Sequence, residues 1–78
     1  MIPTTYEVTH AVDRERALGE LERGGLVIVR GPMVTIRVYH QEGKSWVVFP
    51  GIEPLDFHNA YAALDFADEL ARAGHGPP

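Results

Sequence analysis

The most regular pattern in the chain lies at residues 34–39, where apolar and polar side chains alternate. Val34, Ile36 and Val38 occupy one set of positions, and polar residues occupy the other. A period of two predicts a β-strand with one buried and one solvated face. The neighbouring runs, 26–30 and 45–49, are apolar almost throughout, which indicates strands covered on both faces.

Two turn-forming clusters separate these three runs. Gly31-Pro32 interrupts the first pair, and the Gly-containing segment 41–44 interrupts the second. Turns this short join neighbouring antiparallel strands, so residues 26–49 predict a three-stranded meander. The β-prone residues Thr4–Val8 predict a further short strand at the edge.

Charged segments rich in Ala and Leu flank the meander on both sides. Residues 11–23 predict a helix capped by Thr9 and ended by Gly24-Gly25. Residues 57–73 predict a second helix, for which Asp56 is a suitable N-cap.

The predicted fold is therefore α+β, with a three- or four-stranded antiparallel sheet (a meander) packed against two α-helices in the order β-α-β-β-β-α. Residues 1–74 form a single domain in this interpretation, and residues 75–78 form a disordered tail.

The second predicted helix is apolar on two sides. One stripe suits packing on the sheet and consists of Phe57, Ala60, Leu64, Ala67 and Ala71. Phe66 lies about 180° from Phe57 on the helical wheel, beside Leu70. Either the first helix or the N-terminal strand covers Phe66, or Phe66 and Leu70 contact a partner. With a core this small, we expect a homodimer with both residues at or near its interface.

Part of the sequence resembles patterns found in known protein families. The run Gly43-Lys44-Ser45-Trp46-Val47-Val48, followed by Phe57, Ala63, Ala67 and Ala71, resembles small bacterial domains of unknown function. Those domains have a G-x-W-x-V strand and then a helix that opens on Phe and repeats Ala every four residues. The same run is more distantly similar to the arm-binding domains of phage integrases, which bind DNA. The chain departs from the latter where a phosphate-facing helix would carry Lys or Arg, because it has Asp65, Asp68 and Glu69 there.

Composition narrows the function classes. The chain has 78 residues, no cysteine and a net charge of −4, so neither a disulfide framework nor a thiolate metal site supports its small core. Residues 24–50 are mildly basic, whereas residues 51–78 are strongly acidic. The first ten residues lack the features of a signal peptide, and no apolar run approaches the roughly 18 residues of a membrane span. We expect a cytoplasmic protein that does not contact a membrane.

Candidate chemistry is sparse. The four histidines follow no ligand spacing such as HExxH, and no nucleophile elbow or phosphate-binding Gly-rich loop is present. We therefore expect a protein that is not an enzyme, with no metal site and no cofactor.

The first functional hypothesis is a small acidic inhibitor or adaptor that binds a protein partner. In size, charge and absence of catalytic motifs the chain is similar to phage-encoded anti-CRISPR proteins. Its acidic side chains would occlude a basic nucleic-acid-binding surface of the partner, with an apolar anchor beside them. The acidic candidates are Asp65, Asp68, Glu69, Glu53 and Asp56, and the apolar candidates are Phe66, Leu70 and Tyr61.

The alternative hypothesis is a nucleic-acid-binding domain that uses the solvated face of the sheet. Basic and aromatic side chains there would contact phosphates and stack on bases, and the candidates are Arg30, Arg37, Tyr39 and Lys44. The net negative charge disfavours this hypothesis, so we expect no tight direct binding to nucleic acid.

Overall fold

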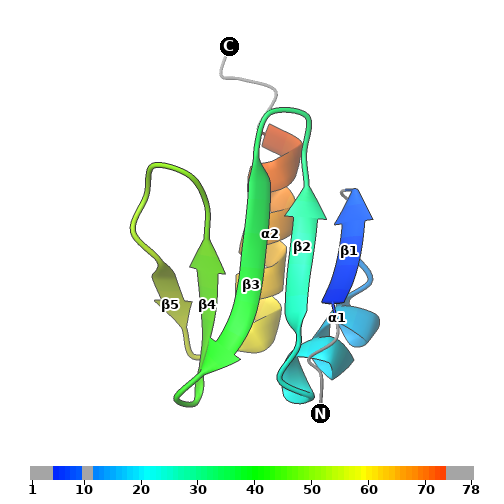
Figure 1. Cartoon of the computed structure of the whole chain (residues 1–78), viewed down its shortest axis with the longest axis vertical. Coiled ribbons are helices and arrows are strands. Elements are labelled where there is room, and N and C mark those ends of the chain that lie inside the picture. The colour runs from blue at the N-terminus through cyan, green and yellow to red at the C-terminus, as the bar shows by residue number, and fades with distance from the viewer. Residues whose placement is uncertain (1–4, 10–11, 74–78) are drawn as a thin grey trace.

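The computed structural model describes residues 5–9 and 12–73, which form a five-stranded sheet and two helices (Figure 1). The elements are β1 (Thr5–Thr9), α1 (Arg14–Glu22), β2 (Leu26–Arg30), β3 (Thr35–Gln41), β4 (Lys44–Val48), β5 (Leu55–Phe57) and α2 (Ala60–Ala73). The strands lie side by side in chain order from β1 to β5. The predicted α+β class is confirmed, whereas the number and direction of the strands are not.

The predicted meander is confirmed for β2, β3 and β4, which pair antiparallel with Val38 between Val27 and Val47. The turn between β3 and β4 contains Glu42 and Gly43, which have φ values of 55° and 77°. Two successive residues with positive φ are the signature of the tight hairpin turn that matches strand twist. This turn therefore sets the register of the two strands.

The predicted N-terminal strand is present as β1, but the expectation of a purely antiparallel sheet was wrong. β1 pairs parallel to β2, with Tyr6 opposite Val27. The reason is the helix between them. The helix carries the chain from the end of β1 back to the level at which β1 began. The next strand therefore runs in the same direction as β1.

Residues Leu55–Phe57 form a fifth strand where the sequence predicted the start of a helix. Asp56 pairs with Trp46 of β4 and does not cap a helix. The helix α2 begins at Ala60, and the side chain of Asn59 accepts a hydrogen bond of 2.8 Å from the amide of Tyr61. Asn59 is therefore the capping residue.

Helix α1 is also shorter than predicted. It begins at Arg14, and the side chain of Asp13, rather than that of Thr9, accepts the amide of Arg16. Thr9 is instead the last residue of β1. At its C-terminal end, Gly24 has a φ of 81°, and the amide of Gly25 donates to the carbonyl of Glu20, as in the predicted Gly-terminated helix. The predicted start at Ala11 and the predicted disordered tail at 75–78 lie outside the described residues.

Both helices pack on the same face of the sheet, as Figure 1 shows, where they lie behind the strands. The core between the layers is built from β-branched side chains of the strands and from Leu and Ala side chains of the helices. Its largest fully buried members are Leu21, Ile36, Leu64, Val27, Val29, Val38 and Val47. The three buried alanines of α2 bring that helix close to the sheet.

α2 also approaches the backbone closely at Gly31, in the turn after β2. A Cβ atom on Gly31 would lie 2.3 Å from the carbonyl oxygen of Ala71. Glycine is therefore the residue that lets the β2–β3 hairpin rest on the C-terminal turn of α2.

Candidate functional site

With both helices on one side, none of the described elements covers the other side of the sheet. We call this side the open sheet face. Two rows of cross-strand neighbours form its centre, and they run across β2, β3 and β4. The first row is Leu26–Tyr39–Trp46, and the second is Ile28–Arg37–Val48.

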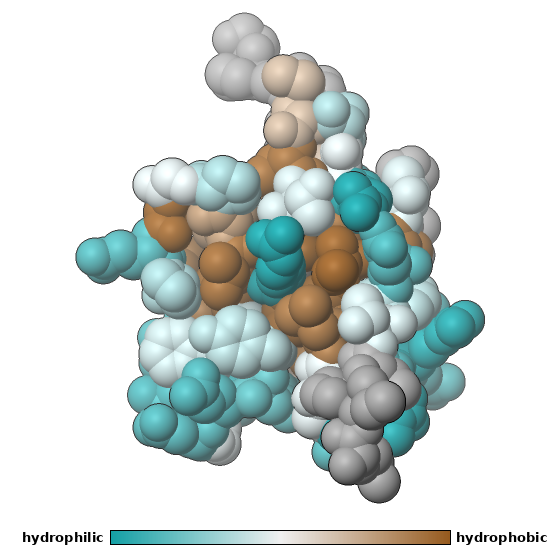
Figure 2. Space-filling view, viewed as in Figure 1, coloured by the Kyte–Doolittle hydropathy of each residue, from teal (hydrophilic) through white to brown (hydrophobic). Residues whose placement is uncertain are grey.

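The open sheet face is largely apolar at its centre. Leu26, Ile28, Tyr39, Trp46 and Val48 are all half-buried, so each still presents part of its side chain to solvent. Figure 2 views this face and shows hydrophobic surface on both sides of a hydrophilic protrusion at the middle of the sheet. Apolar side chains gathered on one uncovered face of a small domain favour a binding site there.

The aromatic pair on this face is held in place. The indole Nε1 of Trp46 donates a hydrogen bond of 3.2 Å to the backbone carbonyl of Gln41, and Tyr39 is the direct cross-strand neighbour of Trp46. An aromatic side chain with few free rotations loses little entropy when a partner packs on it. The pair is therefore suited to serve as an anchor.

The charged side chains of the open sheet face are paired toward its two edges. Arg30 of β2 contacts Glu7 of β1 in an ion pair, and Lys44 of β4 lies 3.1 Å from the carboxylate of Asp56 on β5. The hydrogen bond from Lys44 holds the pKa of Asp56 below its usual value, and the backbone amide of Asp56 and the charge of Lys44 act in the same direction.

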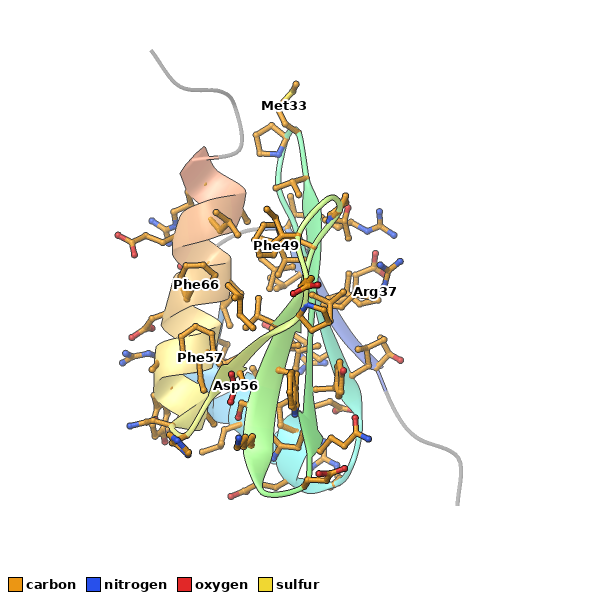
Figure 3. All side chains as sticks on the ribbon, turned by 90° about the vertical axis from the view of Figure 1, so that its left-hand side faces the viewer. Met33, Arg37, Phe49, Asp56, Phe57 and Phe66 are labelled. Carbon is orange, nitrogen blue, oxygen red and sulfur yellow. The ribbon has the colours of Figure 1, made fainter. Side chains whose placement is uncertain are left out.

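Arg37, in contrast, is exposed and makes no ion pair or hydrogen bond with any described residue. It lies on β3, the middle strand of the five. Figure 3 shows its side chain extending from the sheet on the side opposite to α2. The open sheet face thus has an uncompensated guanidinium among apolar side chains.

The sequence predicted part of this face. The structure brings all four basic and aromatic candidates, Arg30, Arg37, Tyr39 and Lys44, onto it. Missing from the prediction were Leu26, Ile28, Trp46 and Val48, because their strands appeared apolar enough to be covered on both faces. The strict alternation of β3 was the available signal, since its neighbours share the exposed side.

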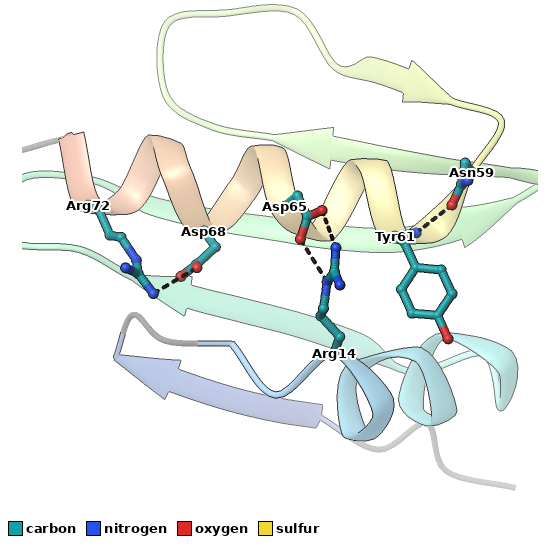
Figure 4. Close-up of polar contacts among 6 residues, drawn as sticks. All are labelled: Arg14, Asn59, Tyr61, Asp65, Asp68 and Arg72. Atoms are coloured by element: carbon teal, nitrogen blue, oxygen red, sulfur yellow. Dashed lines mark hydrogen bonds and ion pairs between the residues drawn. The ribbon is translucent and has the colours of Figure 1, made fainter.

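The acidic candidates on α2 lie on the helix side of the molecule, and Asp65 among them contacts α1. Nε of Arg14 donates a hydrogen bond of 2.8 Å to Asp65, and the same guanidinium lies over the ring of Tyr61 with 5.5 Å to its centroid (Figure 4). The hydrogen bond from Arg14 to Asp65 and the charge of that carboxylate raise the pKa of Arg14. Asp65 therefore links α2 to α1 through an ion pair on the surface.

Asp68 is also engaged. Its carboxylate lies 3.1 Å from Arg72 and accepts a hydrogen bond of 3.4 Å from the amide of Val12. Glu69 is exposed next to it, and these acids together with Arg72 line a shallow depression on the surface of α2. Of the three predicted acids of the helix, Asp65 thus contacts α1, whereas Asp68 contacts its own helix and the segment that precedes α1.

The remaining acidic candidates lie elsewhere. Asp56 belongs to the edge of the open sheet face, and Glu53 is exposed in the loop between β4 and β5. The structure therefore does not bring the five predicted acids together on one surface.

Phe66 lies beside Phe57 on the side of α2 that faces the viewer in Figure 3, and Phe49 lies nearer the sheet. Its ring centroid is 5.4 Å from that of Phe57 and 6.4 Å from that of Phe49. Phe66 and Leu70 are half-buried against the core, whereas Tyr61 lies on the α1 side of the helix. The three predicted apolar contacts thus do not form one surface, and the residues that cover Phe66 come from the end of β4 and from β5.

The prediction placed Phe66 opposite the buried stripe because it included Phe57 in the helix, whereas Phe57 belongs to β5. With Ala63 buried, the covered arc of α2 extends to within about 60° of Phe66. The predicted homodimer stays a prediction, since the contacts of Phe66 are those of a residue at the edge of the core.

Comparisons with known proteins give no further guide: no family model, curated protein or solved structure matches the chain. Within residues 5–9 and 12–73, no three His, Asp or Glu side chains converge to hold a metal ion. In that same part of the chain, neither helix is long and apolar enough to cross a membrane.

Proposed function

We propose that this chain is a non-enzymatic binding module that recognises a protein partner through the open sheet face. The observation that carries the proposal is the apolar centre of the sheet, which no described element covers, with the Tyr39–Trp46 pair beside the exposed Arg37. Tyr, Trp and Arg are the residues most enriched among those that dominate binding energy at protein interfaces.

The charge distribution favours a protein over a nucleic acid. On this face Glu7 and Asp56 offset Arg30 and Lys44, which leaves Arg37 to attract a phosphate backbone. Because the salt-dependent affinity for nucleic acid grows with the number of phosphates neutralised, one such cation contributes little. The carboxylates of Glu7 and Asp56, at the edges of the face, would also repel the phosphates of a nucleic acid.

A second candidate is the inhibitor function predicted from the acids of α2, in which they occlude a basic surface of a partner. The shallow depression lined by Asp65, Asp68 and Glu69 is the observation that favours it, since a Lys or Arg side chain would fit its charge. Against it, Asp65 and Asp68 would have to release Arg14 and Arg72. We rank it below the sheet-face proposal for this reason.

The test of the proposal places a photocrosslinking amino acid, benzoylphenylalanine, at either of two aromatic positions. Tyr39 lies on the open sheet face, and Tyr61, an exposed tyrosine on the helix side, is the matched control. Irradiation of cells that produce the labelled protein should crosslink it to another protein from position 39 and only rarely from position 61. Adducts from position 61 alone would favour the acidic surface, and nucleic-acid adducts from position 39 would favour the alternative.

A further inference from the structure

We propose that Arg37 determines which partner the open sheet face accepts, and that this partner is an apolar protein segment carrying a carboxylate that pairs with Arg37. The inference rests on the proposed function and makes its partner specific. It follows from the position of one charged side chain relative to its neighbours.

Apolar side chains lie next to Arg37 on the open sheet face. Its cross-strand neighbours are Ile28 and Val48, and Tyr39 follows it on the same face of β3. A partner that packs on these apolar side chains removes water from the guanidinium at the same time. An ionised group buried without a counter-charge is strongly unfavourable, so a fully apolar partner would be rejected.

A carboxylate on the partner is the group best suited to compensate the charge of Arg37. Arg30 and Lys44 already have carboxylate partners within the chain, whereas Arg37 makes no such pair with a described residue. A carboxylate can accept two parallel hydrogen bonds from a guanidinium, which satisfies both charge and donors in one planar contact. The partner is therefore expected to place an Asp or Glu between apolar side chains.

A second copy of this chain is not the preferred occupant of the open sheet face. Arg37 is on the middle strand of the sheet, so two copies stacked face to face about the centre would place β3 over β3. The two Arg37 side chains would then approach each other, and like charges that lose water together oppose association. The same face, with Glu7 and Asp56 at its edges, also suits a polyanion poorly.

The experiment selects binders from random-sequence peptides displayed on phage, with the folded protein immobilised. Enriched peptides are synthesised, and their affinity is measured for the parent protein, Arg37→Met and Arg30→Met. Both substitutions remove one positive charge from adjacent strands of the same face, and both variants are first checked by thermal melting. The binding surface is located from NMR shifts of the Trp46 indole and the surrounding amides.

We expect the enriched peptides to carry Asp or Glu flanked by apolar residues and to shift the open sheet face. Their affinity should fall roughly 30-fold or more in Arg37→Met, since the substitution leaves a desolvated carboxylate without its partner, and change little in Arg30→Met. Arg37→Glu should restore binding to a peptide in which the acid is replaced by Arg.

Other outcomes separate the two proposals. Peptides that bind the open sheet face but lack an acid, or that bind Arg37→Met equally well, overturn the role of Arg37 and leave the proposed function standing. Peptides that shift α2 instead, or no enrichment at all, count against both. Salt-sensitive binding of a fluorescent single-stranded oligonucleotide, or self-association lost in Ile28→Asp, would identify a nucleic acid or a second copy as the occupant.

Discussion

The open sheet face and the outer surface of the two helices both carry charged side chains, but they use them differently. On the helices, Arg14 of α1 pairs with Asp65 of α2, so these charges are compensated within the fold. On the sheet, the pairs lie toward the edges and leave an apolar centre with Arg37 exposed in it. An acidic segment in a sequence is therefore weak evidence of a binding surface until its partners within the fold are known.

The sharpest test of this contrast compares two aromatic side chains, one from each region. Phe66→Ala should lower the free energy of unfolding by about 2 to 3 kcal/mol, because the ring packs against Phe57 and Phe49 at the edge of the core. Tyr39→Ala should cost about 1 kcal/mol, as expected for a half-buried position in a strand. Chemical denaturation of both variants measures the difference.

The same pair of variants bears on the predicted homodimer. If Phe66 and Leu70 formed its interface, Phe66→Ala would reduce the mass seen by light scattering and leave the melting temperature of the monomer nearly unchanged. A destabilised protein of unchanged mass would place Phe66 in the core. Equal destabilisation by Phe66→Ala and Tyr39→Ala would contradict the distinction between the two regions.

A smaller effect is expected from charge reversal on α2. Asp65→Lys puts a second cation beside Arg14, so it should lower the melting temperature slightly, and added salt should reduce the difference. Glu69→Lys, on the same exposed side of the helix, is the control and should leave melting unchanged. Identical melting curves for the two variants would mean that the Arg14–Asp65 pair adds nothing to the packing of the helices.

The smallest effect concerns the edge of the open sheet face. Because Lys44 lowers the pKa of Asp56 in the folded protein, the pair contributes stability above the usual pKa of an aspartate. That contribution is lost as the pH falls through the lowered pKa and Asp56 becomes protonated. An NMR titration should show the low pKa in the parent protein and a rise toward the ordinary value in Lys44→Met. A pKa unchanged by that substitution would mean that Lys44 does not hold Asp56.

Much of the sheet could be predicted from the sequence, because local signals specify it. The alternation of β3 and the Glu42-Gly43 turn were enough to place β2, β3 and β4 and to assign Arg37 and Tyr39 to one face. The direction of β1 could also have been inferred, since adjacent strands joined through a helix run parallel. β5 could not, because three residues are too few for a period to be visible.

The candidate sites were harder to predict because they depend on packing between distant segments. Whether Ile28 and Val48 are covered depends on which face of the sheet the two helices pack against. A continuous apolar run does not indicate that face. The engagement of Asp65 by Arg14 depends on how α1 lies against α2. These contacts join residues far apart in the chain, so no local sequence pattern predicts them.

The parallel pairing of β1 also has a kinetic consequence. β2, β3 and β4 meet through short turns, so they can assemble early from contacts that are close along the chain. β1 can pair with β2 only when the segment that contains α1 has closed into a loop between the two strands. Closing this longer loop costs conformational entropy before the contacts of β1 form. β1 is thus expected to be the last strand to dock during folding and the first to detach in the native state, leaving the edge of β2 briefly available for pairing with another chain.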